Sequence, residues 1–494
     1  MHKVIKNDSQ RGEEMEVKRK FNEDWLALTI GLAIFALSLG LLAGRDILGW
    51  AVSTSVWTNA TKALGPASKA YTGFSGPVSL LATYVFLLVA LSIGAKLLGA
   101  DIVKFTKAFT VVFAGSYLAW IAGSWAHIAA TPDKLKNFGI NWSLNLTSEA
   151  GFIVALLLGL VVGNFFPSIA RWLKEALRPE LYVKTAIVIL GGFLGVMAAE
   201  QAHLVTSVIF RGICAIIEAY LIYWAVVYYV ARKYFGYSRE WAVPLASGVS
   251  ICGVSAAIAT GSAIRARPVI PVMVSSLVVI FAVLELLLLP FVAKAFLYHE
   301  PLVAGAWLGL AVKTDGAAVA SGAIADALIR AKALSATGVH YQPGWIMGVT
   351  TTVKVFIDVF IGIWAFILAW IWSIKVDRRE NDKVRVREIW DRFPKFILGY
   401  AATFAVALAI CALSPSLLGK TKAAMGQANV FRGIFFVMTF FTIGVISNFR
   451  KLWEEGIAKL AAIYVLCLFG FIIWVGLAIS WVFFHGLKPP IIGG

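Results

Sequence analysis

The sequence has few charged residues and few of the side chains that most often bind metals. Only 14% of its 494 residues are charged, against roughly 25% in an average soluble domain. It contains four cysteines and six histidines, without a CxxC pair or a Cys/His cluster. These scarcities exclude a soluble enzyme and indicate neither a disulfide framework nor a zinc site. The Walker A pattern GxxxxGK[ST] is missing as well, which excludes ATP as the direct energy source.

Apolar residues, in contrast, make up 60% of the chain. They form stretches of about 18 to 25 residues, each long enough to cross a hydrocarbon core of roughly 30 Å. The pattern predicts an all-α polytopic membrane protein with about thirteen transmembrane helices. No small-residue cleavage site follows the first stretch, so we expect it to remain as a span. The predicted spans are 25–43, 77–99, 107–130, 151–165, 183–200, 211–231, 245–263, 270–296, 305–326, 345–373, 396–413, 429–447 and 458–485.

The formal net charge is +17, from 44 basic and 27 acidic residues. In a chain this apolar, the excess indicates basic cytoplasmic loops and not a nucleic-acid partner. The strongest basic run extends from Lys375 to Lys395. The positive-inside rule places this run and the N-terminus in the cytoplasm and the C-terminus outside. We expect a multi-pass protein of the inner (plasma) membrane whose partners are the lipid bilayer and a small solute, and we leave a homodimer open.

Two apolar stretches, 244–268 and 431–450, are unusually rich in Gly, Ser and Thr. If spans four to thirteen form two groups of five, each stretch is the fourth span of its group. Because five is odd, the second group enters the membrane from the opposite side, as in an inverted repeat. We predict that both are discontinuous helices. The alternative is that small residues only let helices pack closely. The predicted division is a cytoplasmic tail (1–24), additional helices with extracytoplasmic loops (25–150), two five-helix repeats (151–300 and 301–485, the second with the basic loop 375–395) and a tail (486–494).

The first of these stretches carries a specific motif, since Ser250 to Thr260 reads SICGVSAAIAT. It matches the S-I-C-G-x-[SA]-A-x-x-A-T pattern of the YeiH-type sulfate exporter family, which the chain resembles over roughly residues 150–485. The resemblance implies a ten-helix core like that of cation/proton antiporters and bile-acid symporters, with two broken helices crossing at its centre. It also implies export of sulfate. Further matching pieces are LLLGLVVGN (156–164), TTVKVFIDVF (351–360) and FFTIGVISNFRKLWEEG (440–456).

The chain departs from the family pattern at two positions. Many members have His-Glu in the ninth span, where this sequence has Lys313 and Thr314 followed by Asp315. The arginine expected after Val-Lys in the tenth span is replaced, and Asp358 lies nearby. Substrate and coupling therefore need not be those of the family.

Ionisable residues inside predicted spans are functional candidates, because a charge in mid-membrane costs roughly 2.5–3.5 kcal/mol on insertion scales. Lys354 and Asp358 are four residues apart on one helix face and close enough to pair. We predict that they form one coupling cluster with Lys313 and Asp315. The alternative is an internal ion pair that only docks the ninth and tenth spans. Glu218 and Glu285 are further candidates. Glu285 has only aliphatic neighbours in sequence and is interpreted as a stray protonated acid, whereas for Glu218 packing against the seventh span and a functional role both stay open.

The ends of broken helices present free N–H and C=O groups that can bind ions without a fixed arginine. We therefore predict a secondary active transporter, an exporter of a small anion such as sulfate or a related sulfur oxyanion, working by alternating access. It needs no cofactor and has no catalytic or metal-binding residues, while H⁺ or Na⁺ serves as coupling ion. The alternatives are a cation/proton antiporter using Asp315 and Asp358, an uptake symporter for another small solute, and a membrane-embedded enzyme. The predicted solute-binding residues are Ser250, Cys252, Gly253, Ser255, Thr260, Thr439, Thr442 and Asn448.

The predicted orientation can be tested with fusion reporters at Asn381, in the basic run, and at Gly494, the last residue. The positive-inside rule places Asn381 in the cytoplasm and Gly494 outside. A reporter active only in the cytoplasm should therefore give signal at Asn381 alone. Signal at both positions would contradict the orientation.

Overall fold

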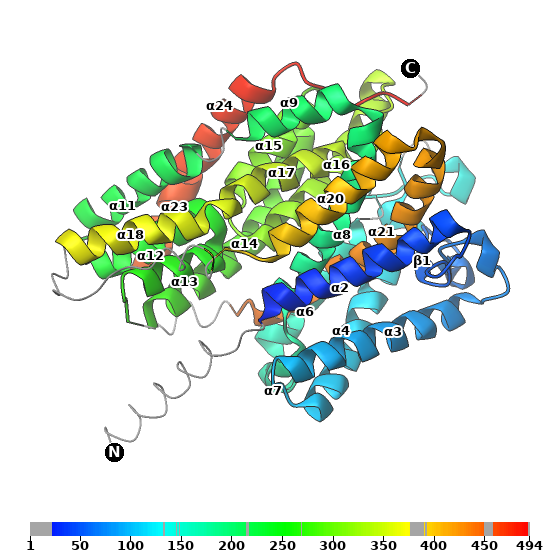
Figure 1. The fold of residues 1–494 in the computed structure, drawn as a ribbon, viewed down its shortest axis with the longest axis horizontal. Coiled ribbons are helices and arrows are strands. Elements are labelled where there is room, and N and C mark those ends of the chain that lie inside the picture. The colour runs from blue at the N-terminus through cyan, green and yellow to red at the C-terminus, as the bar shows by residue number, and fades with distance from the viewer. Residues whose placement is uncertain are drawn as a thin grey trace.

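The computed structural model describes residues 22–131, 134–144, 146, 147, 149–213, 217–267, 269–375, 390, 393–448 and 458–492. These residues are almost entirely helical, and the sheet in this part of the chain is a short antiparallel pair, β1 (Val52–Thr54) with β2 (Leu64–Pro66). Figure 1 shows long helices running roughly side by side. The all-α membrane fold predicted from the hydropathy is therefore confirmed. Most of the predicted N-terminal tail and basic loop, and the reporter position Gly494, lie outside the described residues.

Ten helices in the described part are long and apolar enough to cross a membrane, and α6 and α15 are shorter apolar helices. The count of thirteen spans stays a prediction. The principal helices are α2 (Glu23–Ser38), α3 (Gly76–Leu97), α4 (Ile102–Gly123), α6 (Ala150–Phe165), α7 (Pro167–Trp172), α8 (Pro179–Glu200), α9 (Ala202–Gly212), α11 (Trp224–Lys233), α12 (Arg239–Ser247), α13 (Gly253–Ala263), α14 (Val269–Phe296), α15 (Pro301–Ala311), α16 (Asp315–Thr337), α17 (Trp345–Val359), α18 (Ile361–Lys375), α20 (Phe396–Leu413), α21 (Leu418–Ile446), α23 (Ala458–Cys467) and α24 (Ile473–Phe484).

Glycines bring the helices of one bundle, α2, α4, α6, α8, α20 and α21, into close contact around the deeply buried α8. A Cβ added at Gly191 would lie 2.3 Å from the carbonyl oxygen of Tyr400 on α20. On the other side, a Cβ at Gly159 of α6 would lie 2.2 Å from the carbonyl oxygen of Phe441 on α21. Such contacts are the usual way in which membrane helices gain packing energy. We call this group the first bundle.

The seventh predicted span does not cross the protein. Its α-helix α12 continues as a π-helical turn over Gly248–Cys252 and then breaks, with Gly253 at φ +39°. The chain turns back through α13, so that the backbone N–H of Arg267 donates to the Glu240 carboxylate at 2.8 Å. The two ends of the segment therefore lie together. We call residues 239–263 hairpin 1.

The ninth predicted span is the second broken segment. The helix α15 ends at Ala311, residues 312–314 are extended, and α16 starts at Asp315 with Thr314 as its N-cap. The ammonium of Lys332, near the end of α16, lies 5.5 Å from the ring of Tyr298, which precedes α15. This segment also returns to the end from which it started. We call residues 301–337 hairpin 2.

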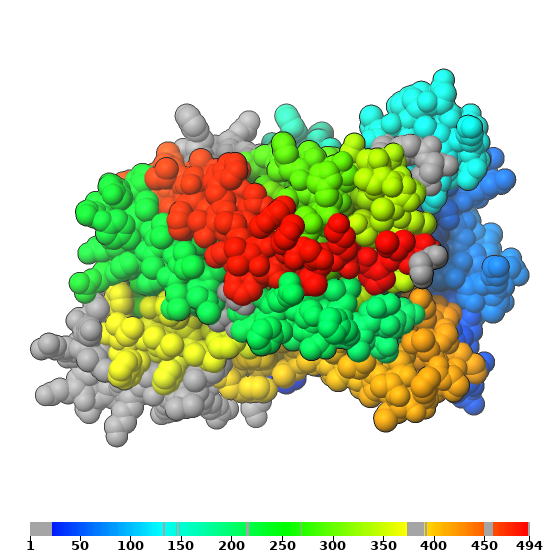
Figure 2. Space-filling view, turned by 90° about the horizontal axis from the view of Figure 1, so that it is seen from above, coloured from blue at the N-terminus to red at the C-terminus, as the bar shows by residue number. Residues whose placement is uncertain are grey.

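The two hairpins open at opposite ends of the protein. The backbone N–H of Gly344, just before α17, donates to the Asp326 carboxylate of hairpin 2 at 3.0 Å. The helices α17 and α18 then run to the other end, where Ala369 packs against Ala263 of hairpin 1. The figure agrees, with α12 and α13 at one end of the long axis (Figure 1). The helix α24 covers hairpin 2 and reaches α9, since the Arg211 guanidinium donates to the Phe483 carbonyl oxygen at 2.7 Å (Figure 2).

The prediction of a break within 431–450 was wrong. Residues 431–446 lie in the continuous helix α21, where the Thr439 hydroxyl donates to the carbonyl oxygen of Phe435 and the Thr442 hydroxyl to that of Met438, while residues 449–450 lie outside the described residues. Its small residues serve packing, because a Cβ at Gly444 would lie 2.4 Å from the Leu156 carbonyl oxygen. The breaks thus lie in the seventh and ninth segments, and the equivalence of the seventh and twelfth has no support. The inverted repeat stays a prediction.

The hairpin arrangement makes a specific prediction for the loops beside it. In a cysteine-free background, Ser238→Cys and Ala266→Cys flank hairpin 1, while His299→Cys and His340→Cys flank hairpin 2. A membrane-impermeant maleimide should label the first two from one side and the last two from the other. If both segments crossed the membrane, Ser238→Cys and Ala266→Cys would react from opposite sides, and that result would contradict the hairpins.

Candidate functional site

The tips of the two hairpins meet in the interior of the protein. A Cβ added at Gly253, the turning point of hairpin 1, would lie 3.1 Å from the carbonyl oxygen of Lys313 and 3.0 Å from the Thr314 side chain. A side chain there would be strained twice, by its positive φ and by this contact. Glycine therefore allows the two breaks to touch. We call the meeting point, with the side chains of Cys252, Asp315, Lys354 and Asp358, the crossing.

Lys354, on α17, connects both breaks. Its ammonium donates to the carbonyl oxygen of Ile251 at 2.8 Å, at the end of the first half of hairpin 1. It also donates to the carbonyl oxygens of Lys313 at 3.3 Å and Val312 at 3.4 Å, beyond the end of α15. Helix C-terminal ends carry partial negative charge. The buried lysine, 1% exposed, therefore neutralises two of these ends at once.

Two carboxylates and a thiol complete the crossing. The Cys252 thiol donates to Asp315 at 2.6 Å, and Asp315 begins α16, where the helix dipole stabilises a negative charge. The ligand atoms of Cys252, Asp315 and Asp358 all lie within 4.8 Å of one another, close enough to hold a metal ion. Among the described residues, one oxygen of Asp358 has no hydrogen-bond partner. The structure thus brings together Asp315, Lys354 and Asp358, and the ion pair of Lys354 is with Asp315, at 4.0 Å, and not with Asp358.

The side chain of Lys313 points away from the crossing, into a second buried group. Its ammonium binds the Leu310 carbonyl oxygen and lies 4.7 Å from the ring of Tyr223. Its backbone N–H donates to Glu285 at 2.9 Å, and the Tyr464 hydroxyl donates to the other oxygen of Glu285 at 2.7 Å. Glu218 binds the Tyr223 hydroxyl. We call Glu218, Tyr223, Glu285, Lys313 and Tyr464 the rear cluster.

Sequence reasoning missed the rear cluster because it treated Glu218 and Glu285 separately. The available signal was Tyr223, five residues after Glu218. Side chains at this spacing face each other in a π-helical turn, in which hydrogen bonds join residues five apart. The structure has such a turn over Glu218–Tyr223. Tyr464 could be linked to Glu285 only by tertiary structure.

The remaining predicted solute-binding residues divide into two groups. Ser250 is buried, and its hydroxyl has no hydrogen-bond partner among the described residues, while Ser255 lies in the first turn of α13. Thr439 approaches hairpin 2, since a Cβ at Gly316 would lie 3.5 Å from its methyl group. The hydroxyls of Thr260, Thr439 and Thr442 are all bonded to carbonyls of their own helices. Asn448 follows the end of α21, next to Ser447, whose carbonyl oxygen accepts from Asn164 at 3.0 Å.

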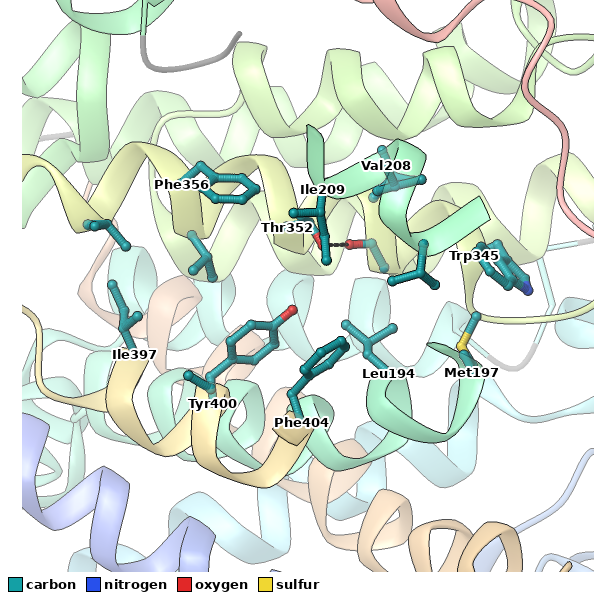
Figure 3. A pocket seen from close by; sticks show the side chains of 16 residues that line it. Leu194, Met197, Val208, Ile209, Trp345, Thr352, Phe356, Ile397, Tyr400 and Phe404 are labelled. Atoms are coloured by element: carbon teal, nitrogen blue, oxygen red, sulfur yellow. Dashed lines mark hydrogen bonds between the residues drawn. The ribbon is translucent and has the colours of Figure 1, made fainter. Parts of the chain in front are cut away.

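An apolar cavity of about 290 Å³ separates α17 from the first bundle. Figure 3 shows side chains from α8, α9, α17 and α20 facing it, among them Leu194, Val208, Phe356 and Phe404. The labelled hydroxyls are those of Thr352 and Tyr400. The lining cannot compensate an ion, so the cavity is not the site of a charged solute. It marks where α17, which carries Lys354, packs loosely on its neighbours.

Comparison with known proteins places the chain in a family. Residues 141–463 match the family model described as conserved hypothetical protein 698. A UPF0324 membrane protein of Nitrosomonas europaea is 41% identical over 475 residues, which cover 95% of this chain and 97% of that protein. This chain belongs to the UPF0324 membrane protein family. A UPF0324 membrane protein of Nitratidesulfovibrio vulgaris is 29% identical over 84% of this chain and 66% of that protein. No solved structure matches the chain.

The structure predicts that Lys354 is essential for stability. Lys354→Met leaves Asp315 without its cation and three carbonyl oxygens without their donor, so it should lower the free energy of unfolding by about 3–5 kcal/mol. The matched control is Lys422→Met, because Lys422 also forms an ion pair, with Glu200, but is 61% exposed. That change should cost less than about 1 kcal/mol. Denaturant titration in mild detergent measures both, and equal losses would contradict the role of Lys354.

Proposed function

We propose that this UPF0324 protein is an ion-coupled secondary transporter of a small anion and that the solute binds at the crossing. The observation that supports this most strongly is the meeting of two hairpins from opposite ends around the buried Lys354. Discontinuous helices at membrane depth are tolerated only where they are covered by protein or line a cavity, and in transporters they form the ion and substrate sites. In a helix bundle without a transport function, such breaks would cost backbone hydrogen bonds and add no stability.

The chemistry of the crossing favours an anion. The helices α13 and α16 both begin at the breaks. The free backbone N–H groups and the partial positive charge of their N-terminal ends therefore lie beside the crossing. Lys354 adds a full positive charge. The resemblance to sulfate exporters narrows the anion to sulfate or a related sulfur oxyanion, with export as the proposed direction.

The carboxylates suggest how transport is coupled. Asp315 and Asp358 are each at most 2% exposed. Two ionised carboxylates beside an anion would repel it in a medium of low dielectric constant. Anion binding therefore requires protonation of at least one of them, and by linkage protonation favours anion binding. We propose the proton as the coupling ion.

Cys252, Asp315 and Lys354 are at most 3% exposed, and we therefore propose that this structure represents an occluded state of the transport cycle. Solute can reach the crossing only if the hairpins and α17 move relative to the first bundle. The apolar cavity lies on that boundary and is lined by side chains that lose little by sliding. We propose that alternating access occurs there.

Basic residues at one end of the protein support a cytoplasmic position for the open end of hairpin 1. At the start of α2, Glu23 binds Arg178 at 2.6 Å, and Asp24 accepts from the backbone of Lys395 at 3.2 Å. The hairpin adds Arg267 at its own open end. The positive-inside rule assigns such a basic end to the cytoplasm, and we propose the plasma membrane as the location.

Cation/proton exchange is the second candidate, and one observation favours it. Cys252, Asp315 and Asp358 place a sulfur and carboxylate oxygens close enough to hold a metal ion. Thiolate and carboxylate are both metal ligands. In this case Lys354 would compete with the cation for Asp315.

Uptake into proteoliposomes tests the proposal. Labelled sulfate, sulfite and thiosulfate should accumulate when a pH gradient is imposed, and a protonophore should abolish the accumulation. Uptake of a divalent metal ion instead, with no anion transported, would support cation exchange and contradict anion transport.

Thiol protection shows whether the solute binds at the crossing. In a variant whose other cysteines are replaced, the transported anion should slow modification of Cys252, which lies beside Asp315. A variant that retains only Cys467, buried on α23, is the matched control and should react at the same rate with and without anion. Transport without protection of Cys252 would move the solute site away from the crossing.

A further inference from the structure

Tyr223 makes two hydrogen-bonding contacts in the rear cluster through a single hydroxyl group. One partner is a carboxylate oxygen of Glu218, at the start of the same π-helical turn. The other is the carbonyl oxygen of Ile472, at 2.9 Å, at the end of a second π-helical turn over Leu468–Ile472. The hydroxyl thus links two irregular turns from distant parts of the sequence.

The chemistry of these three groups limits where the hydrogens can lie. A tyrosine hydroxyl has one hydrogen to donate, and a backbone carbonyl can only accept. The tyrosine hydrogen can therefore serve either Glu218 or Ile472, but not both. If it serves Ile472, the hydrogen between Tyr223 and Glu218 comes from Glu218, which can donate only as a carboxylic acid.

The surroundings of Glu218 agree with a neutral acid. Its side chain is 1% exposed, and its second oxygen has no hydrogen-bond partner among the described residues. On α24, the neighbour is Gly476, where a Cβ would lie 3.6 Å from the first oxygen. The nearest cation is Lys313, whose ammonium binds the Leu310 carbonyl oxygen and faces the ring of Tyr223. Among the described residues its one donor is the Tyr223 hydroxyl, and with that hydrogen on Ile472 a buried, ionised carboxylate would be costly there.

Glu285 shows the opposite pattern within the same cluster. It accepts from the Tyr464 hydroxyl and from the backbone N–H of Lys313, one donor for each oxygen. Two donors suit an ionised carboxylate. Lys313 then balances Glu285, and the proton on Glu218 leaves the cluster neutral.

We propose that Glu218 is a proton-binding site of this protein, separate from the carboxylates of the crossing. Its role in coupling rests on the proposed function, whereas its protonation does not. When Glu218 releases its proton, the Tyr223 hydrogen turns from the Ile472 carbonyl oxygen toward the carboxylate. The new negative charge also attracts the Lys313 ammonium away from Leu310. Because the backbone of Lys313 binds both Lys354 and Glu285, the state of Glu218 reaches the tip of hairpin 2.

Infrared spectroscopy of the purified protein tests the protonation directly. A neutral carboxylic acid has a carbonyl-stretch band that a carboxylate lacks. Glu218→Gln keeps a donor for Tyr223 but should remove one such band from the wild-type spectrum. Glu285→Gln is the matched control and should leave that band in place. A carboxylic-acid region unchanged in Glu218→Gln would overturn the proposal.

A second variant covers the case in which Glu218→Gln does not fold. Tyr223→Phe removes the hydroxyl but keeps the acid, so it should shift the same band to higher frequency through loss of the hydrogen bond. An unshifted band would place the proton elsewhere.

Transport measurements test the coupling role. Glu218→Gln should still exchange labelled for unlabelled anion across proteoliposome membranes, but accumulation driven by a pH gradient should fall to the level without a gradient. Full pH-driven accumulation by Glu218→Gln would overturn the coupling role. If wild-type protein transports none of the anions, the proposed function fails, and the infrared result still decides whether Glu218 holds a proton.

Discussion

The bonds of the Lys354 ammonium to backbone carbonyls of both hairpins are the interaction on which the centre of this structure depends. Each break leaves helix-end carbonyls unpaired at membrane depth, where no water is available to satisfy them. One lysine compensates both ends and, through Asp315, balances its own charge. Hairpins, α17 and the acid are therefore interdependent, because removal of any one leaves a buried polar group without its partner.

Hydropathy and composition predicted the features that follow from burial in the lipid bilayer, namely the fold class and the first break. The apolar stretches established an all-α membrane protein, and the small residues around Cys252 and Gly253 predicted the first break correctly. They failed in α21 because a threonine in a helix can donate to the carbonyl four residues earlier, which leaves the helix intact. Glycine and threonine content alone cannot distinguish a break from a packing surface.

The second break could have been found in the sequence. Thr314 followed by Asp315 is an N-cap signal in the middle of a predicted span, and Lys313 before it is expensive inside an apolar helix. Together they mark the start of α16. The return of each hairpin to its own end could not be predicted, since the hydropathy of a hairpin equals that of a span. The contact between Arg267 and Glu240 that reveals it is tertiary.

The distance along the chain between hairpin 1 and its lysine has a consequence for biosynthesis. Ile251 and Lys354 are 103 residues apart, so hairpin 1 is synthesised long before the donor of its carbonyl group exists. Until α17 arrives, the tip has to remain near water or be covered by another protein, because an unpaired carbonyl in hydrocarbon costs several kcal/mol. We therefore expect hairpin 1 to reach its final depth only after α17 has been made, so that the segments of this chain settle in the membrane in a different order from that of their synthesis.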